Sequence, residues 1–330
     1  MLDLARWTRQ DAAVELTRRQ ALRVLGAAAS AAALGTALTG CGTSFAGVRL
    51  RIATGGRAGE YFQLGNALSI VWQERLGLAT APEVLPSNGS PANVSLLTTG
   101  AAEVAFCQLD VAVDRMADRS SLRALAAIYN DALQIVVPAG SPIREVADLR
   151  GARVSIGADN SGVAYVAARV LTAAALGGED DVQRVRLDLP GSVAALRAGE
   201  VDAFFWVGGL PTGTVNVLAD AVPVRLLDVE PLLDELRGRF PVYAPGTVLA
   251  GTYRTAVPVS TLLVRNLLLV DASLDANLAQ ALTGALFAEQ QRLVGAAQAA
   301  RTIDSRSAIL TQPVPLHDGA LRWFSTDATA

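Results

Sequence analysis

Two segments about 100 residues apart share one pattern, "LLTTGAAEVAFCQLD" at 96–110 and "ALRAGEVDAFFWVGG" at 195–209. Each is typical of a helix end, a glycine that stops the helix, an acidic residue and then an apolar strand. A Gly-Ser pair that can cap the helix stands before each segment, at 89–90 and at 191–192. The repetition predicts two lobes of similar βαβ architecture, although a glycine, an acid and an apolar strand also occur together in unrelated chains.

Strand-like and helix-like runs alternate along the rest of the chain, which favours an α/β fold with mainly parallel sheets. A strand at 48–53 precedes a helix at 61–77. A second helix begins with Ser90 as N-cap and Pro91 at the first helical position. The runs "LRALAAIYN" and "ALQIVVPAG" predict two further strands.

In sheets of this kind, ligands bind beyond the carboxyl ends of the strands. That rule places Gln108 and Asp110 at one strand end, and Trp206, Val207 and Gly208 at the other. If the two ends face each other, they form a cleft between the lobes.

A glycine-rich turn, "TGGRAGEYFQLG" at 54–65, joins the first strand to the first helix and exposes backbone N–H groups. It is not a nucleotide-binding loop, because the chain contains no lysine and the glycine spacing does not fit G-x-G-x-x-G. The turn either holds a small anionic or polar group or is a structural connection. The same alternatives apply to Ser161 and Gly162, where Ser161 could instead cap a helix and bind nothing.

The N-terminus predicts a targeting segment over residues 1–40, followed by a linker at 41–47. Arg18 and Arg19 precede an apolar run of small residues and resemble a twin-arginine export signal. "LTGC" resembles a lipobox with Cys41 as the lipidated residue; a single membrane anchor is the alternative. Cys107 would then have no disulfide partner.

Composition narrows the function classes. The net charge of −3 gives no basic surface for nucleic acid. The single histidine, His317, and the absence of a G-x-S-x-G motif argue against a metal site and against an exported hydrolase. Asp110, Asp114 and Glu60 could act as a carboxylate set, but we interpret them as solvated or helix-capping. No cofactor is expected.

Six segments together resemble one known family: "ATGGRAGEYFQLGNAL", "SNGSPANVSLL", "AEVAFCQLDVA", "DLRGARVSIGADNSG", "AGEVDAFFWVGGLPT" and "PVPLHDGALRWF". The chain is similar to the TAXI-type extracytoplasmic solute receptors of TRAP transporters. The resemblance implies an α/β, two-lobe, periplasmic-binding-protein-like (type II) fold with a ligand cleft between the lobes. It implies a first lobe at 48–131 plus 263–330 and a second at 132–262.

The resemblance further implies a monomeric receptor, not an enzyme, that is lipid-anchored on the outer face of the cytoplasmic membrane or is periplasmic. It would bind a small carboxylate-bearing solute and deliver it to a TRAP-type permease. An ABC importer or a sensor kinase is the alternative partner. The ligand contacts carried over by motif are Thr54, Gly55, Gly56, Gly59, Tyr61, Ser87, Asn88, Ser90, Asn93, Gln108, Ser161, Gly162, Trp206 and Gly208.

Three positions depart from the family pattern. Glu60 stands where a small hydroxyl residue is usual, Gln63 replaces a proline, and Val163 removes a hydroxyl near the second helix start. An inward-facing Glu60 would repel an anionic ligand, so these residues weaken the case for glutamate. Whether Glu60 and Arg57 face the cleft is not fixed by the sequence.

Overall fold

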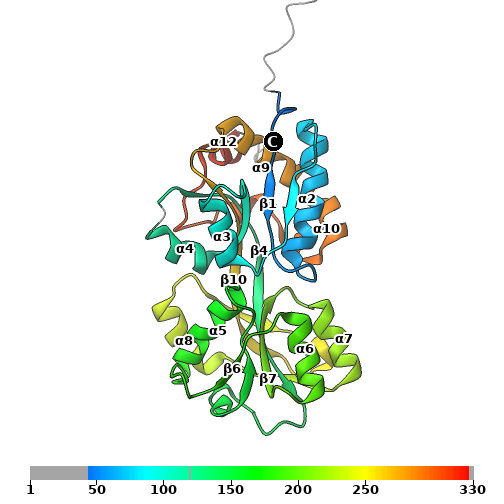
Figure 1. Cartoon of the computed structure of the whole chain (residues 1–330), viewed down its shortest axis with the longest axis vertical. Helices are drawn as coiled ribbons and strands as arrows, with labels where there is room; N and C mark the ends of the chain where they lie inside the picture. The colour runs from blue at the N-terminus through cyan, green and yellow to red at the C-terminus, as the bar shows by residue number, and fades with distance from the viewer. Residues whose placement is uncertain (1–43, 119, 327–330) are drawn as a thin grey trace, which may run out of the picture. The chain divides into compact units, whose positions relative to one another are not determined.

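Two long antiparallel strands, β4 (Leu122–Pro138) and β10 (Val259–Asp271), run through both halves of the described chain (Figure 1). The computed structural model describes residues 44–118 and 120–326. The runs predicted as two separate strands form the single strand β4. That prediction is wrong because Asn130 and Asp131 interrupt the apolar pattern without a turn, and the strand continues from one lobe into the other at this point.

The strands form one sheet in the order β2-β1-β3-β10-β4-β7-β5-β6, with β8 beside β4 and β9 beside β10. We call the part around β1–β3 the first lobe and the part around β5–β9 the second lobe. The shorter strands are β1 (Arg51–Ala53), β2 (Glu83–Leu85), β3 (Val104–Gln108), β5 (Arg153–Ser155), β6 (Gln183–Val185), β7 (Ala203–Gly208), β8 (Val224–Leu226) and β9 (Ala244–Val248).

Helices pack against the sheet in each lobe (Figure 1). Those of the first lobe are α2 (Glu60–Leu76), α3 (Ser90–Thr98), α4 (Leu109–Met116), α9 (Ala276–Ala288), α10 (Gln290–Ala296), α11 (Ser305–Ala308), α12 (Asp318–Thr326) and the short η3 (Gln298–Thr302). Those of the second lobe are α5 (Gly162–Ala173), α6 (Leu189–Ala198), α7 (Gly213–Ala221), α8 (Glu230–Arg239), η1 (Val146–Leu149) and η2 (Thr252–Arg254).

The internal similarity corresponds to a repeated architecture. In the first lobe β1 pairs in parallel with β2 and β3, and in the second lobe β5 pairs in parallel with β6 and β7. The ion pair before the third strand recurs as well. Glu103 accepts from the backbone N–H and guanidinium of Arg51, and Asp202 accepts from the same groups of Arg153. The predicted two-lobe α/β fold is confirmed.

Two of the predicted helix caps are wrong. Gly89, not Ser90, precedes α3, and the hydroxyl of Ser90 instead accepts from the backbone N–H of Gln108. Asp188 caps α6, and Ser192 lies inside that helix. In the second case Pro190 fits the first helical turn, so the helix begins before the Gly-Ser pair.

Four groups of buried apolar side chains form the core. Two lie in the first lobe, around Trp72 and around Cys107, and two lie in the second, around Val166 and around Phe204. The lobes therefore have separate cores joined by strands β4 and β10. The predicted lobe boundaries at 131/132 and 262/263 stay a prediction.

Candidate functional site

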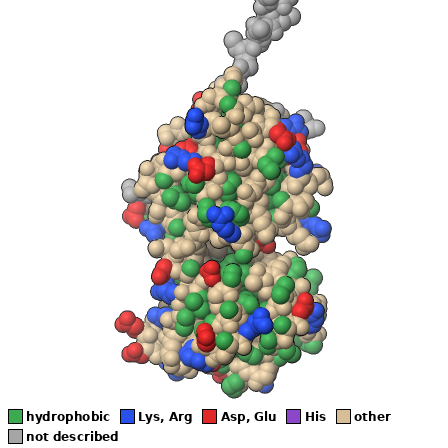
Figure 2. Space-filling model, turned by 45° about the vertical axis from the view of Figure 1, so that its right-hand side comes forward, with side chains coloured by type: hydrophobic (Ala, Val, Ile, Leu, Met, Phe, Trp, Pro, Cys, Tyr) green, Lys and Arg blue, Asp and Glu red, His purple; other side chains and the backbone are tan. Residues whose placement is uncertain are grey.

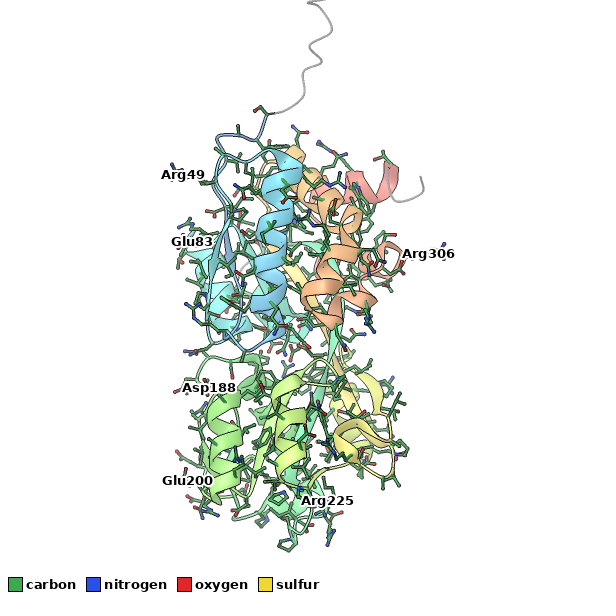
Figure 3. The ribbon with its side chains drawn as sticks, turned by 90° about the vertical axis from the view of Figure 1, so that its right-hand side faces the viewer. Arg49, Glu83, Asp188, Glu200, Arg225 and Arg306 are labelled. Atoms are coloured by element: carbon green, nitrogen blue, oxygen red, sulfur yellow. The ribbon has the colours of Figure 1, made fainter. Side chains whose placement is uncertain are left out.

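A cavity of about 420 Å³ lies between the two lobes and is lined by both. The first lobe contributes the turn before α2, the start of α3, the end of β3 and the middle of β4. The second lobe contributes the starts of α5 and α6 and the end of β7. Figure 2 shows the surface hollowed at the level between the lobes. In Figure 3, Asp188 at the start of α6 lies toward this level and Glu200, just past its end, lies away from it.

Twelve of the fourteen predicted contact residues line the cavity. They are Gly55, Gly56, Gly59, Tyr61, Ser87, Asn88, Ser90, Gln108, Ser161, Gly162, Trp206 and Gly208. Thr54 and Asn93 are fully buried behind this wall. The hydroxyl of Thr54 donates to the carbonyl of Leu85, and the amide of Asn93 donates to the carbonyl of Phe106. These two residues hold the wall in place and do not line the cavity.

Polar contacts connect the lobes across the cavity. The amide of Asn88 donates to the carbonyl of Asp159 at 2.9 Å. A side chain at Gly162 would collide with the carboxamide of Gln108, and a side chain at Gly209 would collide with the carboxylate of Glu60. The absence of a Cβ at these two glycines allows the second-lobe backbone to approach first-lobe side chains.

Ser161 caps α5, because its hydroxyl accepts from the backbone N–H of Ala164 at 3.1 Å. The start of α5 adjoins the start of α3, since a Cβ on Gly89 would lie 3.3 Å from the nitrogen of Gly162. Two helix N-termini, one from each lobe, therefore meet beside the cavity. Their partial positive charges add at this end of the site.

Glu60 points into the cavity, and its Oε2 accepts from the backbone N–H of Gly209 at 2.7 Å. Asp131 of β4 lies beside it and is 4% exposed. Burial raises the pKa of both carboxyls, and the charge of Glu60 raises the pKa of Asp131 further, while the nearby amide of Asn266 offsets part of that shift. The pair therefore retains a proton at a pH where an exposed aspartate would have lost it.

Arg57 is the sole basic residue among the described residues that line the cavity. Its side chain is exposed, and its guanidinium lies 5.2 Å from the ring centre of Phe62. Another part of the lining is apolar and includes Leu187, Phe205 and Val207. Glu60 therefore faces the cavity interior, whereas Arg57 lies at the exposed edge of the cavity.

Tyr129 and Asp131 line the cavity but are absent from the predicted contacts. A signal for them exists in the sequence. The polar pair Asn130-Asp131 interrupts an otherwise apolar run, and a buried charge in a strand is unusual unless it has a partner or a function. From the sequence alone, this interruption is interpreted as the gap between two strands, and for that reason Tyr129 and Asp131 are not among the predicted contacts.

A second contact between the lobes lies outside the cavity, at Arg169 of α5. Its guanidinium donates to the carboxylates of Asp110 and Asp114 on α4, at 3.2 and 2.7 Å. The hydroxyl of Tyr243 also donates to Asp110, at 2.6 Å. Asp110 and Asp114 are thus ion-paired across the lobes and are separate from Glu60, so the three do not form a carboxylate set.

The remaining predicted features lie elsewhere. His317 is buried in the first lobe, does not line the cavity, and accepts from the backbone N–H of Gly319 through Nδ1. Cys107 is buried and is a free thiol. Arg18, Arg19 and Cys41 lie outside the described residues. Within residues 44–118 and 120–326, no helix is both long and apolar enough to cross a membrane.

Comparison with known proteins gives a family. The model of the NMT1-like family matches residues 52–326. The chain belongs to the NMT1-like family. Its fold, with two lobes, a cleft and two crossing strands, is that of the type II periplasmic binding proteins, as predicted.

Three solved structures are similar at low sequence identity. A protein of Bordetella bronchiseptica RB50 is 18% identical over 84% of this chain and 88% of its own, with a TM-score of 0.51. The periplasmic aliphatic sulphonate-binding protein SsuA of Escherichia coli is 17% identical over 84% and 82%, with a TM-score of 0.48. The alkanesulfonate-binding protein SsuA of Xanthomonas axonopodis pv. citri, bound to MOPS, is 17% identical over 84% and 83%, with a TM-score of 0.49.

Proposed function

We propose that this protein is an extracytoplasmic receptor that binds one small polar solute between its lobes and delivers it to a membrane transporter. The observation that carries the proposal is the cavity of about 420 Å³ lined by both lobes. A cavity of this size suits a small metabolite. Because each lobe has its own core, the lobes can open and close about β4 and β10 without unfolding.

The N-termini of α3 and α5 supply a subsite for an acidic group of the solute. The backbone at Ser90 and Gly162 borders the cavity there, and helix N-termini favour a carboxylate. The solute we propose is therefore carboxylate-bearing and polar, of the amino-acid or organic-acid kind. The aromatic face of Trp206 would pack against its apolar part.

The partner we propose is a TRAP-type permease, on the resemblance of the six segments to TAXI receptors. An ABC importer is the competing partner, and a sensor kinase is a further alternative. The two-lobe fold serves all of these, so the fold does not choose among them. Expression with each candidate transporter, in a strain unable to take up the solute, would separate them by which pair restores uptake.

We propose a binding role without catalysis, exercised by a monomer that is exported and lipid-anchored through Cys41. The position of His317 argues against an exported hydrolase, because this histidine is buried and does not line the cavity. A hydrolytic triad would need that histidine within hydrogen-bond distance of a nucleophile at the bound solute.

The receptor function is tested with the purified protein alone. Denaturation should release a small molecule that mass spectrometry can identify. Small-angle scattering of the solute-free protein should then show a smaller radius of gyration once that molecule is added back. If no small molecule is released, and the radius of gyration is unchanged by any extract of polar metabolites, the protein is not a receptor of this kind.

A further inference from the structure

We propose that the solute carries a positively charged nitrogen, held by the carboxyl groups of Glu60 and Asp131 and by the side-chain carbonyl of Gln108. This inference rests on the proposed receptor function and names a chemical group that the solute must have. It assigns Glu60, Asp131 and Gln108 as a cation subsite, distinct from the helix N-termini of α3 and α5.

Buried polar atoms without hydrogen-bond partners among the described residues gather at this subsite. Oδ1 of Asp131 and Oε1 of Gln108 are buried and have no hydrogen-bond partner among the described residues. Their side chains border the cavity, and the two residues are 4% and 3% exposed. The hydroxyl of Tyr129, also buried at the cavity, is unpaired too within the described chain. A buried acceptor without a donor is costly, so a ligand with N–H groups fits here.

The charge of the lining also favours a cation. Glu60 and Asp131 are the carboxyls at the cavity interior, and Asp188 adds a third at the exposed start of α6. Arg57, the basic side chain of the described lining, lies at the exposed edge over Phe62. A cation placed between Glu60 and Asp131 would therefore gain attraction in a poorly solvated site.

Glu60 is fixed through one of its two carboxylate oxygens. Its Oε2 accepts from the N–H of Gly209, which leaves Oε1 available for a second donor. Burial raises the pKa of Asp131, and the adjacent charge of Glu60 raises it further, so the pair takes up a proton more readily than an exposed aspartate does. A cationic nitrogen would replace that proton and supply donors to both side chains.

The cavity favours an organic cation over a bare metal ion. Its volume of about 420 Å³ is larger than one ion fills. Its apolar wall at Phe205 and Val207 suits the hydrocarbon part of an organic molecule. Among the described residues, no group of three or more histidine, cysteine or acidic side chains is arranged to hold a metal.

The test uses four probes of equal chain length whose end groups differ. They are 5-aminopentanoate, 1,5-diaminopentane, pentanedioate and 1,5-pentanediol. The protein is first freed of bound solute by unfolding in urea and refolding. Urea is used in place of guanidinium chloride because guanidinium is itself a candidate ligand. Calorimetry should then show that the two amines bind, and that pentanedioate and pentanediol bind at least about tenfold more weakly.

Glu60→Gln keeps the size of the side chain and removes its charge. It should weaken amine binding by about thirtyfold or more, and Asp131→Asn should act in the same direction. Glu83→Gln is the matched control, because Glu83 is exposed on β2 away from the cavity and should leave binding unchanged. Circular dichroism of each variant checks that it is folded.

The outcomes separate the two proposals. If pentanedioate binds as tightly as 5-aminopentanoate, or if the released solute has no positively charged nitrogen, the cation subsite is wrong and the receptor function stands. If Glu60→Gln binds the amines as well as the wild type does, the assignment is also wrong. If none of the four probes binds and no solute is released, the receptor function itself fails, and the subsite with it.

Discussion

The carboxylate of Glu60, at the first residue of α2, accepts a hydrogen bond from the backbone N–H of Gly209, just past the end of β7. This contact of 2.7 Å joins the first lobe to the second directly at the cavity. It requires glycine at 209, because a Cβ there would collide with the Glu60 carboxylate. Two residues about 150 positions apart in the chain therefore make one of the direct contacts between the lobes.

Gly209→Ala should hold the lobes apart. We expect the protein to stay folded and solute affinity to fall by about 10- to 100-fold, the effect of roughly 1–3 kcal/mol of overpacking in the closed form. Small-angle scattering of the solute-bound state should show a larger radius of gyration than the wild type. Gly213→Ala is the control, since a Cβ at Gly213 meets no atom within 4 Å. Equal affinities for the two variants would contradict this prediction.

Arg169→Met should destabilise the contact between α5 and α4. It leaves the buried carboxylate of Asp110 without its cation, a change that costs roughly 3 kcal/mol. Urea denaturation should report the loss. Arg150→Met removes an exposed ion pair to Asp181 and should cost less than about 1 kcal/mol. A loss for Arg169→Met no larger than for Arg150→Met would show that the inter-lobe ion pair is not stabilising.

Asp131→Asn should change how stability depends on pH in the solute-free protein. The pKa of Asp131 is raised in the folded state, so the folded state binds its proton more tightly than the unfolded state does. The resulting stabilisation is complete below the unfolded pKa of about 3.9 and is lost as pH rises through the folded pKa. Thermal melts across this range should show a smaller decline for the variant than for the wild type, and a higher melting temperature near neutral pH. If the melting temperatures of the variant and the wild type change with pH in parallel, the prediction is wrong.

Cys41→Ser should prevent lipid attachment, if Cys41 is the modified residue of the mature protein. The variant should leave the membrane fraction or keep the mass of the unprocessed chain. Fractionation followed by mass spectrometry of the intact protein distinguishes these results. A variant that stays with membranes at the mature mass would rule out anchoring through Cys41.

Replacement of Arg18 and Arg19 by lysine should block export if the twin-arginine route is used. That route is expected to recognise the guanidinium pair and not positive charge alone. Periplasmic and cytoplasmic fractions of the double variant measure the effect. Normal export would assign the chain to the general secretion route.

The sequence by itself determined the α/β class and the two-lobe repeat, and it indicated part of the cavity wall. Periodicity and glycine stops are local properties, so the segments at 96–110 and 195–209 could be recognised as equivalent from composition and spacing alone. Because parallel strands carry ligands at their carboxyl ends, Gln108 and Trp206 could be assigned to the cleft without coordinates.

Tertiary structure decided which polar groups face the cavity. Thr54 and Asn93 belong to the same local motifs as their neighbours, yet strand pairing and helix packing bury them behind the wall. Asp131 reaches the cavity because β4 passes between the lobes there, opposite Val264 of the distant strand β10. The orientation of a side chain toward a shared cleft depends on such long-range contacts, which local patterns do not encode.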